Sequence, residues 1–278
     1  PKWVIRFCYE LKQRRLGRKI MWHICCRPDE VEEELFVMMK ENGLFSVFLG
    51  LEDGTDAGLK RLNKRMSINK SLNGINILKK LRINIDFGFM LFQPYSTFSS
   101  ITDNLNFLRQ ILSDGYAPVT FLKMMPYYET QIEKELIKEG RLKISNGTRD
   151  YDFRETWMNE YYKFTCTSFM KWLRHPDGLE NTSHWTRNHF SVYLYYFDYF
   201  NNDVLKLFRK FTRIISESNI FLLNTMDELA SFFKSGQYKR DNDALDKYER
   251  NIDLKHDLFL QNVHGIMNEL MLYAEICR

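Results

Sequence analysis

The sequence lacks every long apolar run that a membrane-spanning helix needs. No stretch of its 278 residues reaches the ~18 consecutive apolar residues of such a helix, and the first residues carry no signal-peptide pattern. Cysteines are scarce, and the five present are irregularly spaced, so a disulfide framework is not indicated. We therefore predict a cytoplasmic protein with reduced thiols.

An excess of charge of one sign is also lacking. The 40 basic residues are interleaved with 36 acidic ones, which leaves a net charge of +4. A nucleic-acid-binding surface usually masses its basic residues on one face, so no nucleic-acid partner is expected. The 44% hydrophobic and 27% charged content is ordinary for a globular protein, and a chain of this length can bury a large core.

Most familiar catalytic motifs are missing. The chain has no GxGxxG, GxSxG or phosphate-binding Walker loop, and its six histidines show no HExxH spacing. Cys25 and Cys26 are adjacent, so on a strand their side chains point to opposite faces and cannot easily ligate one metal. We interpret both as small buried apolar side chains and predict no metal site within this chain.

Two hydrophobic periodicities alternate over the first ~125 residues. Apolar runs at 19–26, 45–50, 83–92 and 119–125 predict four strands, and amphipathic patterns predict a helix before the first strand and helices between the strands. Strands that alternate with helices at this spacing indicate a parallel sheet of βα units. The pattern does not distinguish an open barrel from a doubly wound sheet.

The pattern changes after residue 126. A short helix is predicted at 129–140, a polar, turn-rich segment at 140–155, and long helices without a strand from there to the end. One long helix is expected to cover 190–215, another to lie near 219–235, and the last to begin near 240. We predict an α/β domain at 1–150 and a helical region at 151–278.

Ligands of parallel α/β folds bind at the carboxyl ends of the strands. A carboxylate there, such as Glu52, can accept both hydroxyls of a ribose, and Gly50 and Gly54 allow a ligand to approach the backbone. The alternative is that Glu52 and Asp53 cap the helix that begins near Asp56. Similarly, Lys64 and Arg65 can be the solvated end of that helix, complementing its dipole.

Three passages together resemble the later part of the radical S-adenosylmethionine (radical SAM) enzymes. They are "CRPDEVEEELFVMMKENGLFSVFLGLEDGTDAGLKRLNKRMS" (26–67), "FGFMLFQPYST" (87–97) and "MMPYYETQIEKELIKEGRL" (124–142). Their order and spacing are similar to the subgroup that often carries a cobalamin-binding domain ahead of the catalytic barrel. The resemblance covers residues ~20 to 145, about half the chain.

The resemblance implies a fold and a site. The four strands would be the third to sixth of a partial (βα)6 TIM-like barrel. Glu52 would contact the ribose of S-adenosylmethionine and Lys64 its carboxylate. The remaining implied cofactor contacts are Gly50, Gly88, Phe89, Met90 and Leu91, the last four near the adenine. The implied substrate contacts are Pro126, Tyr127, Tyr128 and Thr130, although Glu129 stands where the family usually has glycine.

One family feature is missing from this sequence. Radical SAM enzymes hold a [4Fe–4S] cluster on a Cys-x3-Cys-x2-Cys loop, and no such spacing occurs here. We interpret the chain as the C-terminal portion of an enzyme, inactive alone, whose N-terminal portion carries the cluster ligands. In the intact protein the cluster would reduce S-adenosylmethionine to a 5′-deoxyadenosyl radical that acts on a small-molecule or peptide substrate.

Three further interpretations stay open. A cobalamin domain ahead of this chain would imply methyl transfer or ring-forming chemistry. The chain can instead be a non-catalytic α/β module whose helical half is a partner surface. It can also be an unrelated parallel α/β enzyme, which Glu52 and Lys64 on opposite faces of the sheet would favour.

Overall fold

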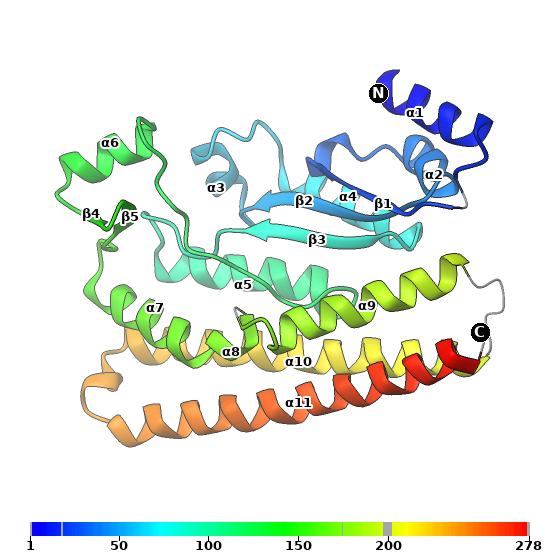
Figure 1. The fold of residues 1–278 in the computed structure, drawn as a ribbon. Coiled ribbons are helices and arrows are strands. Elements are labelled where there is room, and N and C mark those ends of the chain that lie inside the picture. The colour runs from blue at the N-terminus through cyan, green and yellow to red at the C-terminus, as the bar shows by residue number, and fades with distance from the viewer. Residues whose placement is uncertain (1, 18, 174, 197–201, 277–278) are drawn as a thin grey trace.

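A small parallel sheet lies at the centre of the α/β half. The computed structural model describes residues 2–17, 19–173, 175–196 and 202–276. The sheet has the order β1-β2-β3, with both neighbouring pairs parallel, and its strands are β1 (Trp22–Cys26), β2 (Leu44–Glu52) and β3 (Asn84–Phe89). Figure 1 shows these strands beside the helices that connect them.

Helices precede and separate these strands as the sequence predicted. They are α1 (Lys2–Gln13), the short η1 (Pro28–Glu30), α2 (Glu33–Glu41), α3 (Asp56–Arg61), α4 (Ile68–Lys80), α5 (Phe98–Leu112) and α6 (Gln131–Lys138). The predicted α/β class with parallel strands is confirmed. The finer prediction of a partial barrel stays a prediction.

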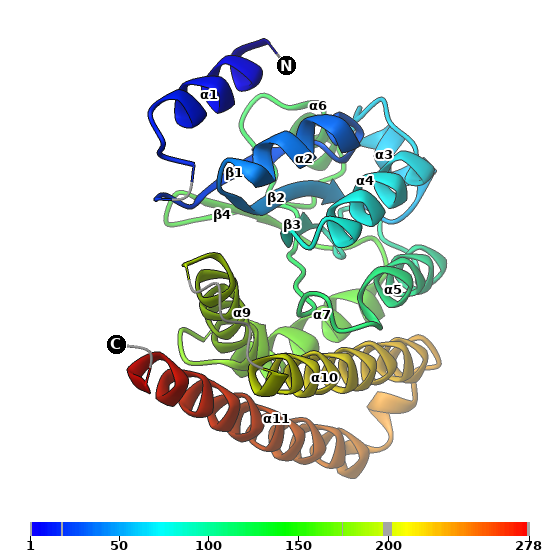
Figure 2. The same ribbon diagram turned by 90° about the vertical axis from the view of Figure 1, so that its right-hand side faces the viewer.

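The two faces of the sheet differ in burial. Along β2 the side chains of Val47, Leu49 and Leu51 are completely buried in the core, whereas Phe48 is 42% exposed. Because successive side chains alternate between faces, one face packs against helices α2 and α4 (Figure 2) and the other stays open. We call the second one the open face.

The fourth predicted strand, at 119–125, is not a regular strand. It pairs with the end of β3 through one isolated parallel bridge, Phe92 to Lys123. Only three backbone hydrogen bonds support it, from Leu122 N to Phe89 O, Phe92 N to Leu122 O and Met124 N to Phe92 O. The first backbone donor of the segment, Val119 N, is bonded instead to the Oδ1 of Asn219, on a later helix, at 2.9 Å.

A β-hairpin occupies most of the segment that was predicted to be only polar and turn-rich. Strands β4 (Leu142–Ser145) and β5 (Thr148–Tyr151) pair antiparallel around Asn146 and Gly147. Both turn residues have left-handed backbones, with φ of 50° and 77°, as a two-residue hairpin turn of Asn-Gly type requires. The strands were missed because most of their side chains are exposed, so no apolar alternation marks them.

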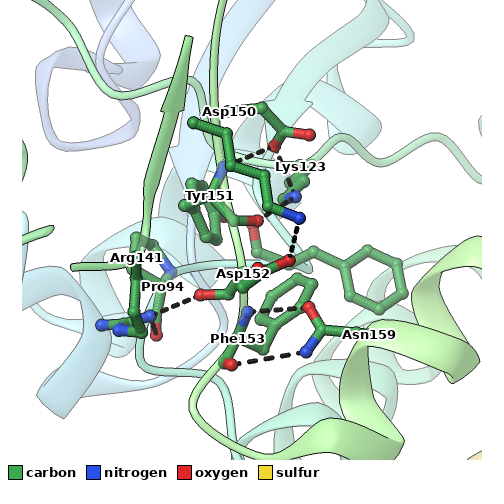
Figure 3. A network of polar contacts seen from close by, with 10 residues as sticks. Pro94, Lys123, Arg141, Asp150, Tyr151, Asp152, Phe153 and Asn159 are labelled. Atoms are coloured by element: carbon green, nitrogen blue, oxygen red, sulfur yellow. Dashed lines mark hydrogen bonds and ion pairs between the residues drawn. The ribbon is translucent and has the colours of Figure 1, made fainter. Parts of the chain in front are cut away.

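The side chain of Lys123, largely buried, links this hairpin to the sheet (Figure 3). Lys123 Nζ lies 2.5 Å from Asp150 Oδ1 and donates to the carbonyl of Tyr151 at 2.8 Å. The rings of Tyr151, Phe153 and Tyr162 surround the ammonium at 4.2, 4.9 and 4.6 Å, where cation–π attraction stabilises it. Burial lowers the pKa of Lys123, and Asp150 opposes that shift.

The second half of the chain is helical. Its elements are α7 (Thr156–Ser168), α8 (Met170–Leu173), α9 (Leu179–Tyr196), α10 (Asn202–Lys234), η2 (Gln237–Lys239) and α11 (Asn242–Ile276). The separate helix predicted near 219–235 is wrong, because α10 runs unbroken through that range. One long helix was predicted to cover 190–215. Its middle part, 197–201, lies outside the described residues.

The helical half packs directly on the α/β half. α10 and α11 lie side by side and antiparallel, farthest from α1, and α5 and α9 lie between them and the sheet (Figures 1 and 2). Arg109 on α5 pairs with Asp227 on α10 at 2.9 Å, and one apolar cluster spans both halves. The domain boundary near 150 stays a prediction. Within the described ranges, no helix combines the length and apolarity that crossing a bilayer requires.

Candidate functional site

Glu52 and Lys64 form an ion pair at the carboxyl end of β2. Lys64 Nζ lies 2.7 Å from Glu52 Oε1, and the two side chains are 26% and 22% exposed. Glu52 sits at an irregularity in the β2–β3 register and has a left-handed backbone with φ of 66°. A non-glycine residue in this conformation is strained. The two predicted ligand contacts therefore meet each other on one side of the sheet.

A patch without side chains lies beside this ion pair. Gly50 of β2 and Gly88 of β3 are direct register partners. A Cβ on Gly50 would come within 3.0 Å of Glu52 Oε1 and 3.8 Å of Lys64 Nζ, so the ion pair lies over the Gly50 backbone. A Cβ on Gly88 would lie 3.3 Å from the ring of Phe48. We call the backbone of Gly50 and Gly88 the glycine patch; it lets a flat ligand approach the sheet closely.

The end of β1 holds the loop that carries Lys64. Arg27 Nη2 donates to the carbonyl of Lys64 at 2.7 Å. The same guanidinium binds both carboxylate oxygens of Asp29, at 2.9 and 3.1 Å, and this contact lowers the pKa of Asp29. The residues on either side of Lys64, Asn63 and Arg65, have left-handed backbones with φ of 54° and 51°. Two strand ends thus position the ion pair together.

Neither acid after β2 caps the following helix. Thr55 is the N-cap of α3, and its Oγ1 accepts from Gly58 N at 2.9 Å. Asp53 is 4% exposed; it accepts from Thr55 N at 2.7 Å and from Gln93 Nε2 at 2.5 Å. The interpretation that Glu52 and Asp53 cap this helix is therefore wrong. Asp53 instead joins the loops that follow β2 and β3.

The predicted contacts near the adenine can be made only in part by side chains. Phe89 and Leu91 are buried at 1% and 0% exposure, and Phe89 stacks on Phe107 with ring centroids 5.9 Å apart. Met90 N donates to the carbonyl of Glu52 at 2.9 Å. Residues 88–91 therefore offer a ligand mainly backbone beside Glu52.

Two of the residues predicted to face substrate have exposed side chains. Tyr127 and Tyr128 are 72% and 67% exposed. Thr130 is the N-cap of α6, and its hydroxyl donates to the carbonyl of Tyr127 at 2.7 Å. Pro126 is buried beside them. Glu129 has a left-handed backbone with φ of 61°, a conformation in which glycine is the least strained residue.

The adjacent Cys25 and Cys26 are not placed to share one metal ion. Cys25 is exposed on the open face, so its predicted burial is wrong, whereas Cys26 points the other way and is partly buried. Burial, and to a lesser extent the nearby Glu30, raises the pKa of Cys26 to about 12. The raised pKa disfavours the thiolate form that binds metals. In the described part of the chain, no three His, Cys, Asp or Glu side chains are placed to hold one metal ion.

A cavity of about 390 Å³ adjoins the glycine patch between the sheet and α9. Its lining combines apolar side chains, among them Phe48, Pro118 and Leu122, with polar ones. Of the polar ones, Asp86 of β3 lies 2.9 Å from His184 Nδ1 of α9 and accepts from Ser46 Oγ at 3.2 Å. Glu180, one helical turn before His184, also lines it.

Electrostatic coupling ties these three groups together. The hydrogen bond to Asp86 raises the pKa of His184, and burial opposes it. Burial raises the pKa of Glu180, Asp86 adds to the rise, and His184 opposes it. Sequence reasoning missed this cluster; the one signal was an acid, Asp86, in the middle of an apolar strand.

Comparison with known proteins gives a fold and no family. No family model and no curated protein matches the chain. It is similar to solved structures of OxsB, a cobalamin-dependent S-adenosylmethionine radical enzyme. The selenomethionine-labelled apo form matches with a TM-score of 0.51 at 14% identity, over 96% of this chain and 48% of that one.

Two liganded forms of OxsB are similar at lower scores. The form with aqua-cobalamin has a TM-score of 0.49, and the form with aqua-cobalamin and S-adenosylmethionine has 0.48, both at 13% identity. They cover 96% and 95% of this chain, respectively, and 48% of the other. The chain thus spans about half the length of the structures it matches. The score of 0.51 shows a related fold.

Proposed function

We propose that the open face of this sheet binds S-adenosylmethionine as part of a radical SAM enzyme. Glu52 would accept hydrogen bonds from the ribose hydroxyls, and Lys64 would pair with the methionine carboxylate. The backbone at Gly50 and at residues 88–91 would lie along the adenosine. When bound in such an enzyme, S-adenosylmethionine supplies a 5′-deoxyadenosyl radical, and this chain's part is to hold and orient it.

The observation that carries the proposal is the ion pair over the glycine patch. A carboxylate and an ammonium on the same side of the sheet match a ligand with ribose hydroxyls and a carboxylate, because each ligand group finds a charge-assisted partner. Their placement together removes the observation that would have favoured an unrelated parallel α/β enzyme, namely Glu52 and Lys64 on opposite faces of the sheet. The strained Glu52 backbone adds support, since such strain clusters at functional sites.

The iron–sulfur cluster does not fit the side chains of this chain. Cys25 and Cys26 point to opposite faces, and the described residues contain no metal-ligating cluster. We therefore propose that the cluster ligands lie outside residues 1–278. A CxxxCxxC motif within ~100 residues upstream in the coding sequence supports the enzyme. Continuous upstream sequence without that motif favours the non-catalytic module.

The first test blocks the glycine patch. Gly88→Val places a side chain against Phe48 on the open face, where it would keep a flat ligand off the backbone. We expect S-adenosylmethionine affinity of the complete protein, measured by calorimetry, to fall at least tenfold, about 1.4 kcal/mol. Gly265→Val is the control, because nothing lies within 4 Å of a Cβ there. Equal affinities of the two variants would contradict the proposal.

A further inference from the structure

The cavity beside the glycine patch has an unusual charge composition. Its lining contains two carboxyl groups, Asp86 and Glu180, and one imidazole, His184, but neither lysine nor arginine among the described residues. Asp86 already has partners, since His184 Nδ1 and Ser46 Oγ both contact it. The buried Arg187, which donates to Asn84 of β3 at 3.0 Å, also acts on Asp86 and on His184. Asp86 is thus compensated without any ligand.

Glu180 is compensated less well than Asp86. In the described lining the only group of opposite charge is the imidazole of His184, which Asp86 already holds at 2.9 Å. Glu180 also lies in the first turn of α9, where the helix N-terminus favours a carboxylate but supplies only a partial positive charge. The lining thus carries more acidic than basic groups, and an added cation would be favoured there.

Other parts of the lining suit an apolar body. The Phe48 ring is 42% exposed and Leu122 is 52% exposed, although both line the cavity. A ring beneath a ligand also attracts a cation through its π face. The volume of about 390 Å³ is within the range of small-molecule sites.

We infer that this cavity binds an organic amine, with its ammonium group between Glu180 and the Asp86–His184 pair and its apolar body against Phe48 and Leu122. The cavity adjoins Gly88, so the amine would lie next to the proposed S-adenosylmethionine position. The claim that the amine is the substrate of the radical enzyme rests on the proposed function. The claim that the amine binds in this cavity does not. The inference names the substrate class that the sequence left open.

The test compares two probes that share a naphthalene ring, one with a charged ammonium group and one with a neutral hydroxyl. 1-Naphthylmethylamine and the neutral 1-naphthalenemethanol are titrated into the complete protein at pH 7. We expect the amine to bind at least tenfold more tightly than the alcohol. Glu180→Gln, which keeps the shape of the side chain, should remove that preference and leave the affinity for the alcohol unchanged. Glu160→Gln on the exposed side of α7 is the control and should keep the preference.

Either of two results would overturn the inference. One is equal affinity of the wild-type protein for both probes, and the other is an amine preference that survives Glu180→Gln. S-adenosylmethionine is titrated into the same samples to separate this inference from the proposed function. If the amine binds and S-adenosylmethionine does not, the cavity assignment stands and the cosubstrate site is contradicted. If S-adenosylmethionine binds and the amine does not, the cosubstrate site stands and the cavity assignment is contradicted.

Discussion

The carboxylate of Glu52 and the ammonium of Lys64 lie 2.7 Å apart above Gly50, although 12 positions separate them in the sequence. The pair depends on two irregularities, a left-handed backbone at Glu52 and a loop held by Arg27. A partly exposed ion pair contributes only about 0–1 kcal/mol to stability. The ion pair therefore contributes little to folding and does not by itself explain the strained backbone at Glu52. The proposed ligand binding would explain it.

The first prediction separates stability from binding at Glu52. Glu52→Gly removes both the ion pair and the strain of a left-handed side-chain-bearing residue, whereas Glu52→Ala removes the ion pair and keeps the strain. We expect the glycine variant to be more stable than the alanine variant by about 1 kcal/mol, measured by urea unfolding. Both should lose S-adenosylmethionine affinity. An alanine variant as stable as the glycine variant would show that the backbone is not strained.

The second prediction concerns Asn219, which holds the irregular fourth segment. This side chain is 2% exposed; it accepts from Val119 N and donates to the carbonyls of Leu112 and Ala117 at 2.9 and 2.8 Å. Asn219→Ala leaves these buried groups unpaired, so we expect a loss of about 2–4 kcal/mol in unfolding free energy. Asn262→Ala on the exposed side of α11 is the control and should change it by less than about 0.5 kcal/mol.

The third prediction is a pH dependence from His184. Its pKa in the folded protein is raised by Asp86 above the usual value of 6.5. A raised pKa means that the pair stabilises the fold fully below pH 6.5 and that this stabilisation is lost as the pH rises through the folded-state pKa. Glu180 and Arg187 face the same imidazole, the first favouring its charged form and the second opposing it.

The measurement compares wild type with His184→Asn across that pH range. We expect wild type to be more stable by about 1 kcal/mol at pH 6 and the difference to shrink above pH 7. Thermal unfolding from pH 5.5 to 9 reports it. A difference that stays constant or grows with pH would mean that His184 is neutral in the folded protein.

Local patterns predicted much of the fold, and contacts between distant segments account for the failures. Apolar runs and amphipathic periodicity placed β1 to β3 and the helices around them, because each element carries its own burial pattern. The segment at 119–125 has a strand-like pattern, but Asn219, one hundred residues later, takes its first backbone donor. The hairpin did have a local signal, the Asn146-Gly147 turn, but without apolar alternation in its strands the sequence prediction missed it.

The candidate site was predictable to a similar extent. Strand ends and the family resemblance singled out Glu52, Gly50 and Lys64, and the structure brings these three residues together; their role in ligand binding stays a prediction. Their direct pairing could not be found, since it depends on the left-handed turn at Glu52. The Asp86–His184 contact joins residues 98 positions apart, from a strand and a helix that no sequence pattern links.

The most direct measurement of the central claim is the affinity of the complete protein for S-adenosylmethionine when each member of the ion pair is neutralised. Glu52→Gln and Lys64→Met keep the size of the side chains and remove one charge each, and Glu160→Gln serves as the control. The account predicts that each of the first two variants weakens binding in calorimetry by ~1–3 kcal/mol, as for a lost charge-assisted contact. Unchanged affinity in both would contradict it and leave this pair as a structural feature of the turn.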